Sequence, residues 1–383
     1  MQKFFAKIYF YLRVLFQTNF TLSKPPNKKY LIFDERNSNY FYRYFKKKDC
    51  HILHSRYETL NLYILLKNFL RLRFSPMNYL NEYVKTVDPK IIITLSDHNP
   101  TFYKIDSSPN RLKVFCQYAY RSAFSDVFSD KIIKSISKKK LKVNYMFVFG
   151  REIGKKYKQY INGEYKVIGS FRNNIYKISK KKKYDIFYIS TWREKKFTKS
   201  LSRAQVFWKK IIYEMQGQLI KLIFLYTKKN KKKLYIYGST VTSNQIEKEK
   251  LFYQKLLGKK NWIFLPNNID KTYEYIDKAK ITICMDSTLG YESLARGNKV
   301  ILFCLRGRLF KSFNFGWPAN LRQNGFFWTN KLSKKTFNNI VDRVSLVSKN
   351  RWNVIIKKHL KSVITYDKDN YKFQSLIKNY LQT

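Results

Sequence analysis

A chain of 383 residues exceeds the length at which a single hydrophobic core stops growing, so two domains are expected, and an apolar fraction of 44% suffices for two cores. The 77 lysines and arginines outnumber the 25 acidic residues and give a formal charge of +52, which attracts phosphates, nucleic acids or an anionic bilayer. Basic runs are scattered along the chain, which argues against a dedicated nucleic-acid patch, and an AT-rich genome would also favour many lysines.

The four cysteines argue against zinc. Cys50, Cys116, Cys284 and Cys304 lie far apart without a CxxC pair, and the chain has only four histidines. We expect small reduced thiols, two of them inside buried strands, and a cytoplasmic location. No uninterrupted apolar run approaches the length needed to span a bilayer, so no membrane-crossing helix is expected.

The N-terminus has the pattern of a basic amphipathic helix, which we place within residues 1–25. Apolar residues between Phe4 and Phe16 recur at spacings of three and four, and Lys3, Lys7 and Arg13 lie mostly elsewhere around the helix. Two placements stay open. The helix packs on the protein's own body, or it lies on the anionic cytoplasmic face of the inner membrane as a peripheral anchor.

Strands and helices alternate along the rest of the chain. Within residues 26–168, strands are predicted at 29–34, 88–96, 111–117 and 145–150 and a helix at 57–73. After a hinge at 169–183, strands are predicted at 185–190, 234–237, 262–265, 281–285 and 300–303 in a second domain, 184–330. A helical tail, 331–383, is expected to pack back across the hinge.

This alternation predicts an α/β fold with two Rossmann-like domains facing each other across a cleft. A ligand would bind between them, beyond the carboxyl ends of the strands.

The run 280–303, KITICMDSTLGYESLARGNKVILF, reads as strand, loop, helix and strand. Asp286, Ser287 and Thr288 can cap the helix and leave backbone N–H groups free for an anion, and Gly290 permits close approach to the backbone. The alternative is an ordinary capped helix. Glu292 could accept hydrogen bonds from a ribose or serve as a capping carboxylate.

Two other predicted strand ends carry similar chemistry. The first strand of the second domain is followed by Ser190, Thr191 and Arg193, and the next strand by Gly238 and Ser239. Hydroxyls, glycine and a guanidinium are the groups that bind a diphosphate. We expect the three loops to surround one crevice.

Several segments resemble a known family. They are LSDHNPTFYKI (95–105), VFCQYAYRSAFSDVF (114–128), FGREIGKKY and IGSFRNN (149–174), YISTWRE (188–194) and MDSTLGYESLARGNKV (285–300). This set resembles the bacterial surface carbohydrate biosynthesis proteins, sugar transferases for lipopolysaccharide or capsule that are similar in plan to glycosyltransferases of the GT-B fold. The resemblance covers about residues 30–330, and it departs from the family pattern at Tyr118 and Ala119, where an Asn-Gly pair is expected.

The resemblance implies a nucleotide-sugar donor in the second domain, UDP- or CMP-linked, and a glycan or glycolipid acceptor in the first. No further cofactor is expected. An inverting transfer needs a general base and positive charge on the departing phosphate. Asp97 is the expected base and His98 the second candidate, with turn capping and a structural donor as the alternatives.

The remaining candidate ligand-binding residues flank the predicted cleft. Asp34 and Arg36 follow the first strand and would bind the acceptor or line the cleft. Arg172 and Asn173 lie in the hinge segment, and Arg172 or Arg193 would supply positive charge beside the Ser287–Thr288 loop. No metal site is predicted, because no DxD-type carboxylate pair is apparent.

Two other functions stay open at this point. A non-hydrolysing sugar-nucleotide epimerase would share the fold, although it should bring more carboxylates and histidines into the cleft than this chain has. A basic nucleic-acid-binding protein would explain the charge and the aromatic residues, but no recognised motif for it appears, and no specific nucleic acid is expected as a partner.

Overall fold

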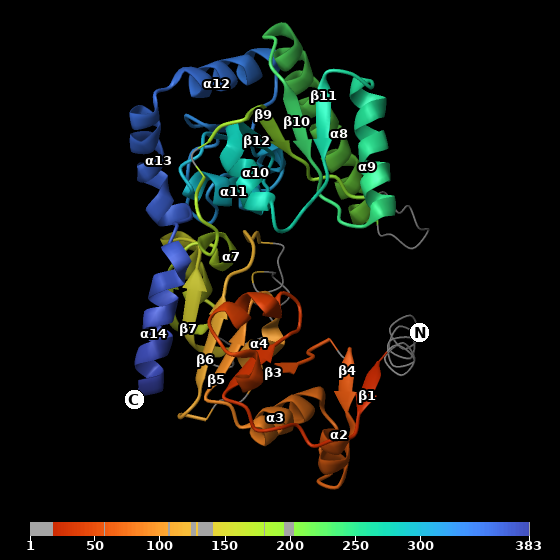
Figure 1. Cartoon of the computed structure of the whole chain (residues 1–383), viewed down its shortest axis with the longest axis vertical. Coiled ribbons are helices and arrows are strands. Elements are labelled where there is room, and N and C mark those ends of the chain that lie inside the picture. The colour runs from red at the N-terminus through yellow and green to blue at the C-terminus, as the bar shows by residue number, and fades with distance from the viewer. Residues whose placement is uncertain are drawn as a thin grey trace.

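The computed structural model describes residues 18–56, 58–105, 108–123, 128, 141–179, 181–194 and 203–382. Two six-stranded parallel sheets dominate it, and Figure 1 shows them in two bodies, one above the other, with helices packed on the sheet faces. The predicted α/β class and the two Rossmann-like domains are confirmed.

The first sheet has the order β3-β2-β5-β6-β7-β8. Its strands are β2 (Tyr30–Phe33), β3 (Cys50–Leu53), β5 (Ile91–Thr94), β6 (Leu112–Cys116), β7 (Lys142–Val148) and β8 (Asn162–Val167). The chain builds outward in one direction from β2 and in the other from β5, so the topological switch point lies between these two strands. β3 and β8 were missed from sequence; β8 alternates exposed and half-buried residues because it lies at the sheet edge.

The helices of the first domain are α2 (Leu62–Phe69), α3 (Pro76–Val87), α4 (Pro100–Lys104), α6 (Arg151–Lys158) and α7 (Phe171–Asn174), with 3-10 turns at Ser38–Arg43 and Lys47–Asp49. The helix predicted at 57–73 is shorter than expected. Thr59–Asn61 form β4, which pairs in parallel with β1 (Asn19–Thr21). The Asn61 side chain accepts from the Ile64 N–H at 3.0 Å and so starts α2.

The second sheet has the order β11-β10-β9-β12-β13-β14, the strand order of a Rossmann fold. Its strands are β9 (Tyr184–Ile189), β10 (Leu234–Tyr237), β11 (Trp262–Leu265), β12 (Ala279–Cys284), β13 (Val300–Phe303) and β14 (Trp328–Thr329). Helices α8 (Arg203–Lys229), α9 (Ser243–Leu257), α10 (Thr272–Lys278) and α11 (Thr288–Ala295) connect them, with 3-10 turns at Leu305–Arg308 and Lys311–Phe313. Here the switch point lies between β9 and β12.

The C-terminal tail crosses from the second domain to the first. It comprises α12 (Lys334–Leu346), α13 (Lys349–Val363), a turn at Lys368–Asn370 and α14 (Tyr371–Gln382). Phe373 and Ile377 of α14 belong to the apolar core on one face of the first sheet, and Figure 1 shows α14 alongside that domain. The tail therefore ties the two domains together.

Two predictions concern other parts of the chain. The residues that carry the predicted amphipathic helix, 4–16, lie outside the described residues. Within the predicted segment 1–25, residues 19–21 are a strand rather than a helix. The four cysteines are free, and Cys116, Cys284 and Cys304 are buried as expected of small apolar thiols.

Candidate functional site

A cavity of about 820 Å³ lies between the domains, at the carboxyl ends of both sheets. The second domain contributes the loops that follow β9, β10, β12 and β13, and the first contributes residues after β2 and β6 and from α7. Its polar lining includes Arg36, Asn37, Tyr118, Arg172, Ser190, Thr191, Arg193, Gly238, Ser239, Asp286, Ser287, Thr288 and Arg306. Because β9 and β12 flank the switch point, this is where a doubly wound sheet binds its ligand.

The cavity is strongly basic. Four guanidinium groups line it, and Asp286 is the one carboxylate among the described lining residues. Arg306 forms a bidentate pair with Asp286, with Nε at 2.6 Å from Oδ2 and Nη2 at 2.5 Å from Oδ1. The surplus of positive charge in a concave site favours an anionic ligand, and guanidinium groups match phosphate oxygens in geometry.

The turn between β12 and α11 supplies short polar groups to the cavity. Ser287 caps α11, because its Oγ accepts from the Leu289 N–H at 3.3 Å. Thr288 Oγ1 accepts from the Tyr120 N–H of the first domain at 3.1 Å. Ser287 and Thr288 thus lie where the predicted anion would meet the positive end of the helix, and Thr288 also joins the two domains.

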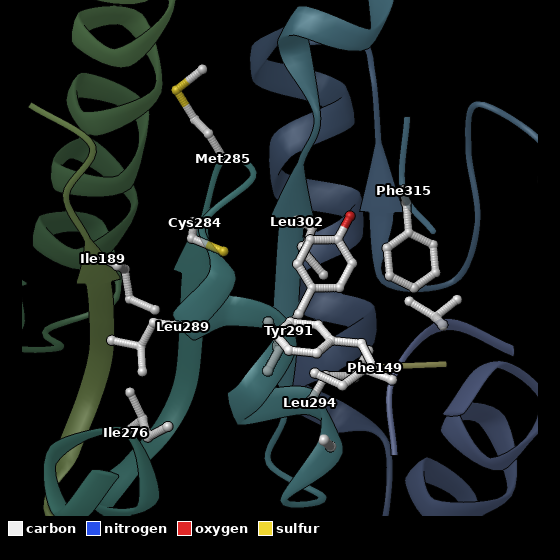
Figure 2. Close-up of a cluster of buried hydrophobic side chains, with 14 of the residues drawn as sticks. Phe149, Ile189, Ile276, Cys284, Met285, Leu289, Tyr291, Leu294, Leu302 and Phe315 are labelled. Carbon is white, nitrogen blue, oxygen red and sulfur yellow. The ribbon is translucent and has the colours of Figure 1, made fainter. Parts of the chain in front are cut away.

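Gly290 does not face the cavity, contrary to the prediction that it admits a phosphate. A Cβ added at this position would lie 2.3 Å from Cys284 Sγ. Figure 2 shows α11 close beside β12, with Leu289 near Ile189 and the Tyr291 ring near Phe315. The glycine therefore permits close packing of helix on strand, and burial raises the pKa of the Cys284 thiol to about 12.

Glu292 is fully buried, and it does not line the cavity as a ribose-binding residue would. Its Oε1 accepts from Ser170 Oγ at 2.5 Å and its Oε2 from Arg172 Nη2 at 3.3 Å. Arg172 itself reaches the cavity and donates from Nε to the Tyr273 hydroxyl at 2.7 Å. Burial lowers the Arg172 pKa, but Tyr273, Glu292, Tyr118 and Tyr40 together outweigh burial and hold that pKa well above its ordinary value.

Asn173 also lies behind the cavity rather than in it. Its Oδ1 accepts from Arg296 Nη1 at 3.0 Å, and Arg296 is paired with Asp277, both side chains being fully buried. Residues 170–174, inside the predicted hinge, are thus bonded to α11 and to the residues that follow it. Their role is to fix the position of Arg172.

A buried carboxylate that was not predicted holds two cavity loops together. Glu249 of α9 is fully buried and accepts from Ser190 Oγ at 2.5 Å, from both Ser239 N–H and Oγ, and from Thr240 N–H and Oγ1. A Cβ on Gly238 would lie 2.8 Å from Phe264 Cζ and 3.2 Å from Glu249 Oε2. The hydroxyls of Ser190 and Ser239 therefore donate to Glu249, and the absence of a side chain at Gly238 makes room for the Phe264 ring and for the carboxylate.

Asp97 is not available as the base predicted from sequence. It is fully buried, its Oδ2 accepts from Arg121 Nε at 2.7 Å and from the Tyr157 hydroxyl at 2.5 Å, and its Oδ1 accepts from the Tyr118 N–H at 3.1 Å. Burial opposes the charge on Arg121, but Asp97 and Tyr157 together outweigh burial and raise the Arg121 pKa. The carboxylate is structural and positions the Tyr118 segment at the cavity.

His98 is half-buried and stands apart from the cavity lining. Its Nδ1 lies 3.3 Å from Arg121 Nη2. A guanidinium only donates, so Nδ1 accepts and a neutral ring carries its proton on Nε2. The contact with Arg121 thus occupies Nδ1, the nitrogen through which this tautomer could accept a proton.

Asp34 and Arg36 have different roles in the structure. Asp34 is buried and accepts from Arg56 Nη2 at 2.9 Å, from Ser96 Oγ at 2.8 Å and from the Arg36 N–H at 3.1 Å. Its φ of 80° turns the chain sharply after β2. Asp34 thus shapes the turn, and Arg36 is exposed in the cavity.

Several cavity residues were not predicted from the sequence. Most of them follow the carboxyl end of a parallel strand, and this position would have identified them. Arg306, Asn37 and Tyr118 each follow the carboxyl end of a parallel strand, as the predicted residues do. Tyr118 joins two other cavity residues of the first domain, because its hydroxyl donates to Asn37 Oδ1 and accepts from Arg172 Nη1, both at 3.3 Å. Gln216 of α8 carries no such signal, because helix-borne lining residues depend on tertiary packing.

Two features are absent from the part of the chain that the structure describes. No group of three or more His, Cys, Asp or Glu side chains there is arranged to hold a metal ion. No helix in those same residues is both long and apolar enough to cross a membrane.

Comparison with known proteins gives one family. The model of a family described as "putative O-antigen biosynthesis protein" matches residues 114–381. No curated protein matches the chain.

Solved structures with similar architecture have low sequence identity. One is the wall teichoic acid polymerase TagF, which is 12% identical to this chain. The match covers 97% of this chain and 92% of TagF, with a TM-score of 0.48. Another is S. aureus MnaA with UDP, which is 11% identical; the match covers 93% of this chain and 97% of MnaA, with a TM-score of 0.48. A third is the UDP-GlcNAc 2-epimerase of Methanocaldococcus jannaschii with UDP-GlcNAc and UDP, which is 13% identical; the match covers 92% of this chain and 99% of the epimerase, also with a TM-score of 0.48. The strand order of the chain itself establishes the fold.

Proposed function

This chain belongs to the O-antigen biosynthesis protein family, and we propose that it is a nucleotide-sugar-dependent glycosyltransferase that acts, without a metal ion, in the synthesis of a surface polysaccharide or lipopolysaccharide. The second domain holds the donor and the first holds a glycan or glycolipid acceptor. The donor is UDP- or CMP-linked, and the transfer inverts the anomeric centre.

The observation that carries this proposal is the basic cavity at the switch point of the second sheet. Arg306, Arg193 and the start of α11 surround the carboxyl ends of β9 and β12. A guanidinium binds phosphate oxygens in pairs, and a helix N-terminus presents N–H groups to an anion. Arg36 and Arg172 approach from the acceptor side, so positive charge lies on both sides of the ligand.

This arrangement suits the departure of a nucleotide. An acceptor hydroxyl oxygen forms a bond to the anomeric carbon, the bond from that carbon to the phosphate oxygen breaks, and the phosphate leaves with the electron pair. The arginines stabilise the charge that builds on it, as a metal ion does in other transferases.

The hydroxyl proton must go to a base. Asp286 is the one carboxylate among the described residues that line the cavity. Its ion pair with Arg306 breaks when the donor phosphates bind the guanidinium, and the carboxylate is then able to accept a proton. We assign the proton to Asp286 on this ground.

The epimerase alternative finds little support in the cavity. Asp286 is the single carboxylate and no histidine occurs among its described lining residues. A reaction that removes and returns protons on the sugar ring needs more such groups.

The test is to incubate the protein with a panel of UDP-, CMP- and GDP-sugars and membrane glycolipids of a polysaccharide-producing bacterium, and to follow nucleotide release and product by mass spectrometry and NMR. The proposal expects acceptor-dependent release of one nucleotide and a product of inverted anomeric configuration. Conversion of the sugar while it remains attached to the nucleotide would establish an epimerase instead.

A further inference from the structure

The first domain carries exposed apolar side chains at its end away from the second domain, where Figure 1 shows β1 and α2. The residues come from β1 and the residue that follows it, from α2 and from the segment after α2, and we call the surface they form the α2 surface. It comprises Phe20, Leu22, Leu65, Leu66, Phe69, Leu70, Leu72 and Phe74, with exposed fractions from 36% to 78%. Several of them line a groove of about 800 Å³ together with Leu60, Leu62 and Tyr63.

Local structure explains why these side chains are outside. α2 has apolar residues around most of its circumference, and it buries Ile64 and Asn68 against the domain. Leu66 and Phe69 are therefore left outward, 59% and 62% exposed. After α2 the chain turns at Leu72, whose φ is 52°, and Phe74 packs back on Phe69 with ring centroids 5.9 Å apart.

The charges around the surface are basic. Lys67 and Arg71 both reach Glu82, at 2.6 and 3.0 Å, so one buried carboxylate faces two cations. Arg73 and Lys24 are exposed beside the apolar residues. Residues 59–81 contain no Asp or Glu, and the acidic residues at the two ends of this stretch are the exposed Glu58 and the buried Glu82. The four cations outnumber these two carboxylates, so the rim of the surface carries a net positive charge.

We propose that the α2 surface docks this protein on an anionic lipid bilayer. Exposed Leu and Phe side chains enter the boundary between headgroups and acyl chains, and the basic rim meets the negative headgroups. Exposure of such an apolar patch to water is unfavourable, whereas its apolar centre and positive border match the acyl chains and the negative headgroups of such a membrane. The inference does not depend on the transfer reaction, and it concerns a different part of the chain from the amphipathic segment 4–16.

The test is sedimentation of the full-length protein with vesicles of phosphatidylcholine alone or with phosphatidylglycerol. Wild type should bind the anionic vesicles, and more weakly as salt rises. The variant Leu66→Ser/Phe69→Ser/Leu70→Ser should bind at least about tenfold more weakly, because three inserted side chains are lost. Arg73→Gln should lose about fivefold.

The matched control is Leu251→Ser/Leu309→Ser/Leu346→Ser, which changes three apolar residues of the second half of the chain that are 50%, 45% and 85% exposed. It should bind as wild type does. Circular dichroism and nucleotide calorimetry confirm that each variant is folded, and they report on the cleft separately from the membrane.

Any one of four results would overturn the proposal. Wild type does not bind anionic vesicles, or the triple α2 variant binds them as tightly as wild type. Binding is lost in a Phe4→Ser/Phe5→Ser variant but kept in the α2 variant, which would assign the contact to the N-terminal segment. Light scattering shows that wild type is a dimer and the α2 variant a monomer, and neither protein binds vesicles. That result would make the α2 surface an interface between two copies of the chain.

Discussion

At the scale of single residues, the cavity combines side chains that line it with buried side chains behind them that hold the lining in place. Arg36, Arg193 and Arg306 line the cavity, whereas Glu249 and Glu292 are fully buried behind it. A buried carboxylate is costly unless hydrogen bonds or a counter-charge satisfy it. Glu249 meets this condition with hydroxyl and amide donors, and Glu292 with Arg172 and Ser170.

Replacement of Glu249 should loosen two cavity loops at once. Glu249→Ala leaves the donors of Ser190, Ser239 and Thr240 without their acceptor, so we expect a loss of about 2–4 kcal/mol in the free energy of unfolding, measured with urea. Nucleotide affinity should fall as well. Glu247→Ala on the same helix is the control, because Glu247 is exposed, and an equal loss in both variants would contradict this role.

Replacement of Asp286 separates binding from chemistry. Asp286→Asn removes the proposed proton acceptor and frees Arg306 for the donor, so kcat should fall about a hundredfold or more while the donor binds at least as tightly. Steady-state kinetics and calorimetry together measure the two effects. Weaker donor binding with unchanged kcat would show that Asp286 only positions Arg306.

At the scale of elements, the sequence predicts the β12–α11 unit well, because strand pattern, helix cap and following strand are all local. Ser287 and Thr288 lie in the cavity as the loop pattern indicates. The roles of Gly290 and Glu292 could not be predicted, because Cys284 and Arg172 reach them only in the folded chain. The same holds for Asp97, whose partners Arg121 and Tyr157 lie 24 and 60 residues further on.

Helix α14 should contribute strongly to the stability of the first domain. Phe373 is fully buried, and its ring contacts those of Tyr44, Phe147 and Phe171 at 5.0–5.5 Å between centroids. We expect Phe373→Ala to cost about 3–5 kcal/mol in the free energy of unfolding. Tyr371→Ala on the same helix, 71% exposed, should change little. A Phe373→Ala variant as stable as wild type would mean that α14 is not part of the core.

At the scale of the whole molecule, the two sheets present their carboxyl ends to one cleft, and contacts across it are specific. Tyr120 of the first domain stacks on Tyr291 of α11 with centroids 3.8 Å apart, and its N–H binds Thr288. The formal charge of +52 is spread over the chain, but the cavity concentrates guanidinium groups at one place. This concentration, rather than net charge, distinguishes the site.

Salt dependence should therefore separate the cleft from nonspecific attraction. A nucleotide that releases about two counterions should lose roughly tenfold in affinity between about 50 and 200 mM salt, whereas RNA bound through many phosphates should lose about a thousandfold or more. Parallel titrations of a nucleotide and an RNA oligomer measure both slopes. A nucleotide slope as steep as that of RNA would place binding on the general basic surface.

The most direct test of the central claim is calorimetric titration with UDP, CMP, CDP and GDP of wild type, Arg306→Gln and Arg308→Gln. Arg306 lines the cavity, and Arg308 is exposed outside it on the same 3-10 turn. We predict saturable binding of one nucleotide, at least about tenfold weaker in Arg306→Gln because a charge-assisted contact is lost, and unchanged in Arg308→Gln. Binding of none of the four, or an equal loss in both variants, would contradict a nucleotide site at the switch point of the second domain.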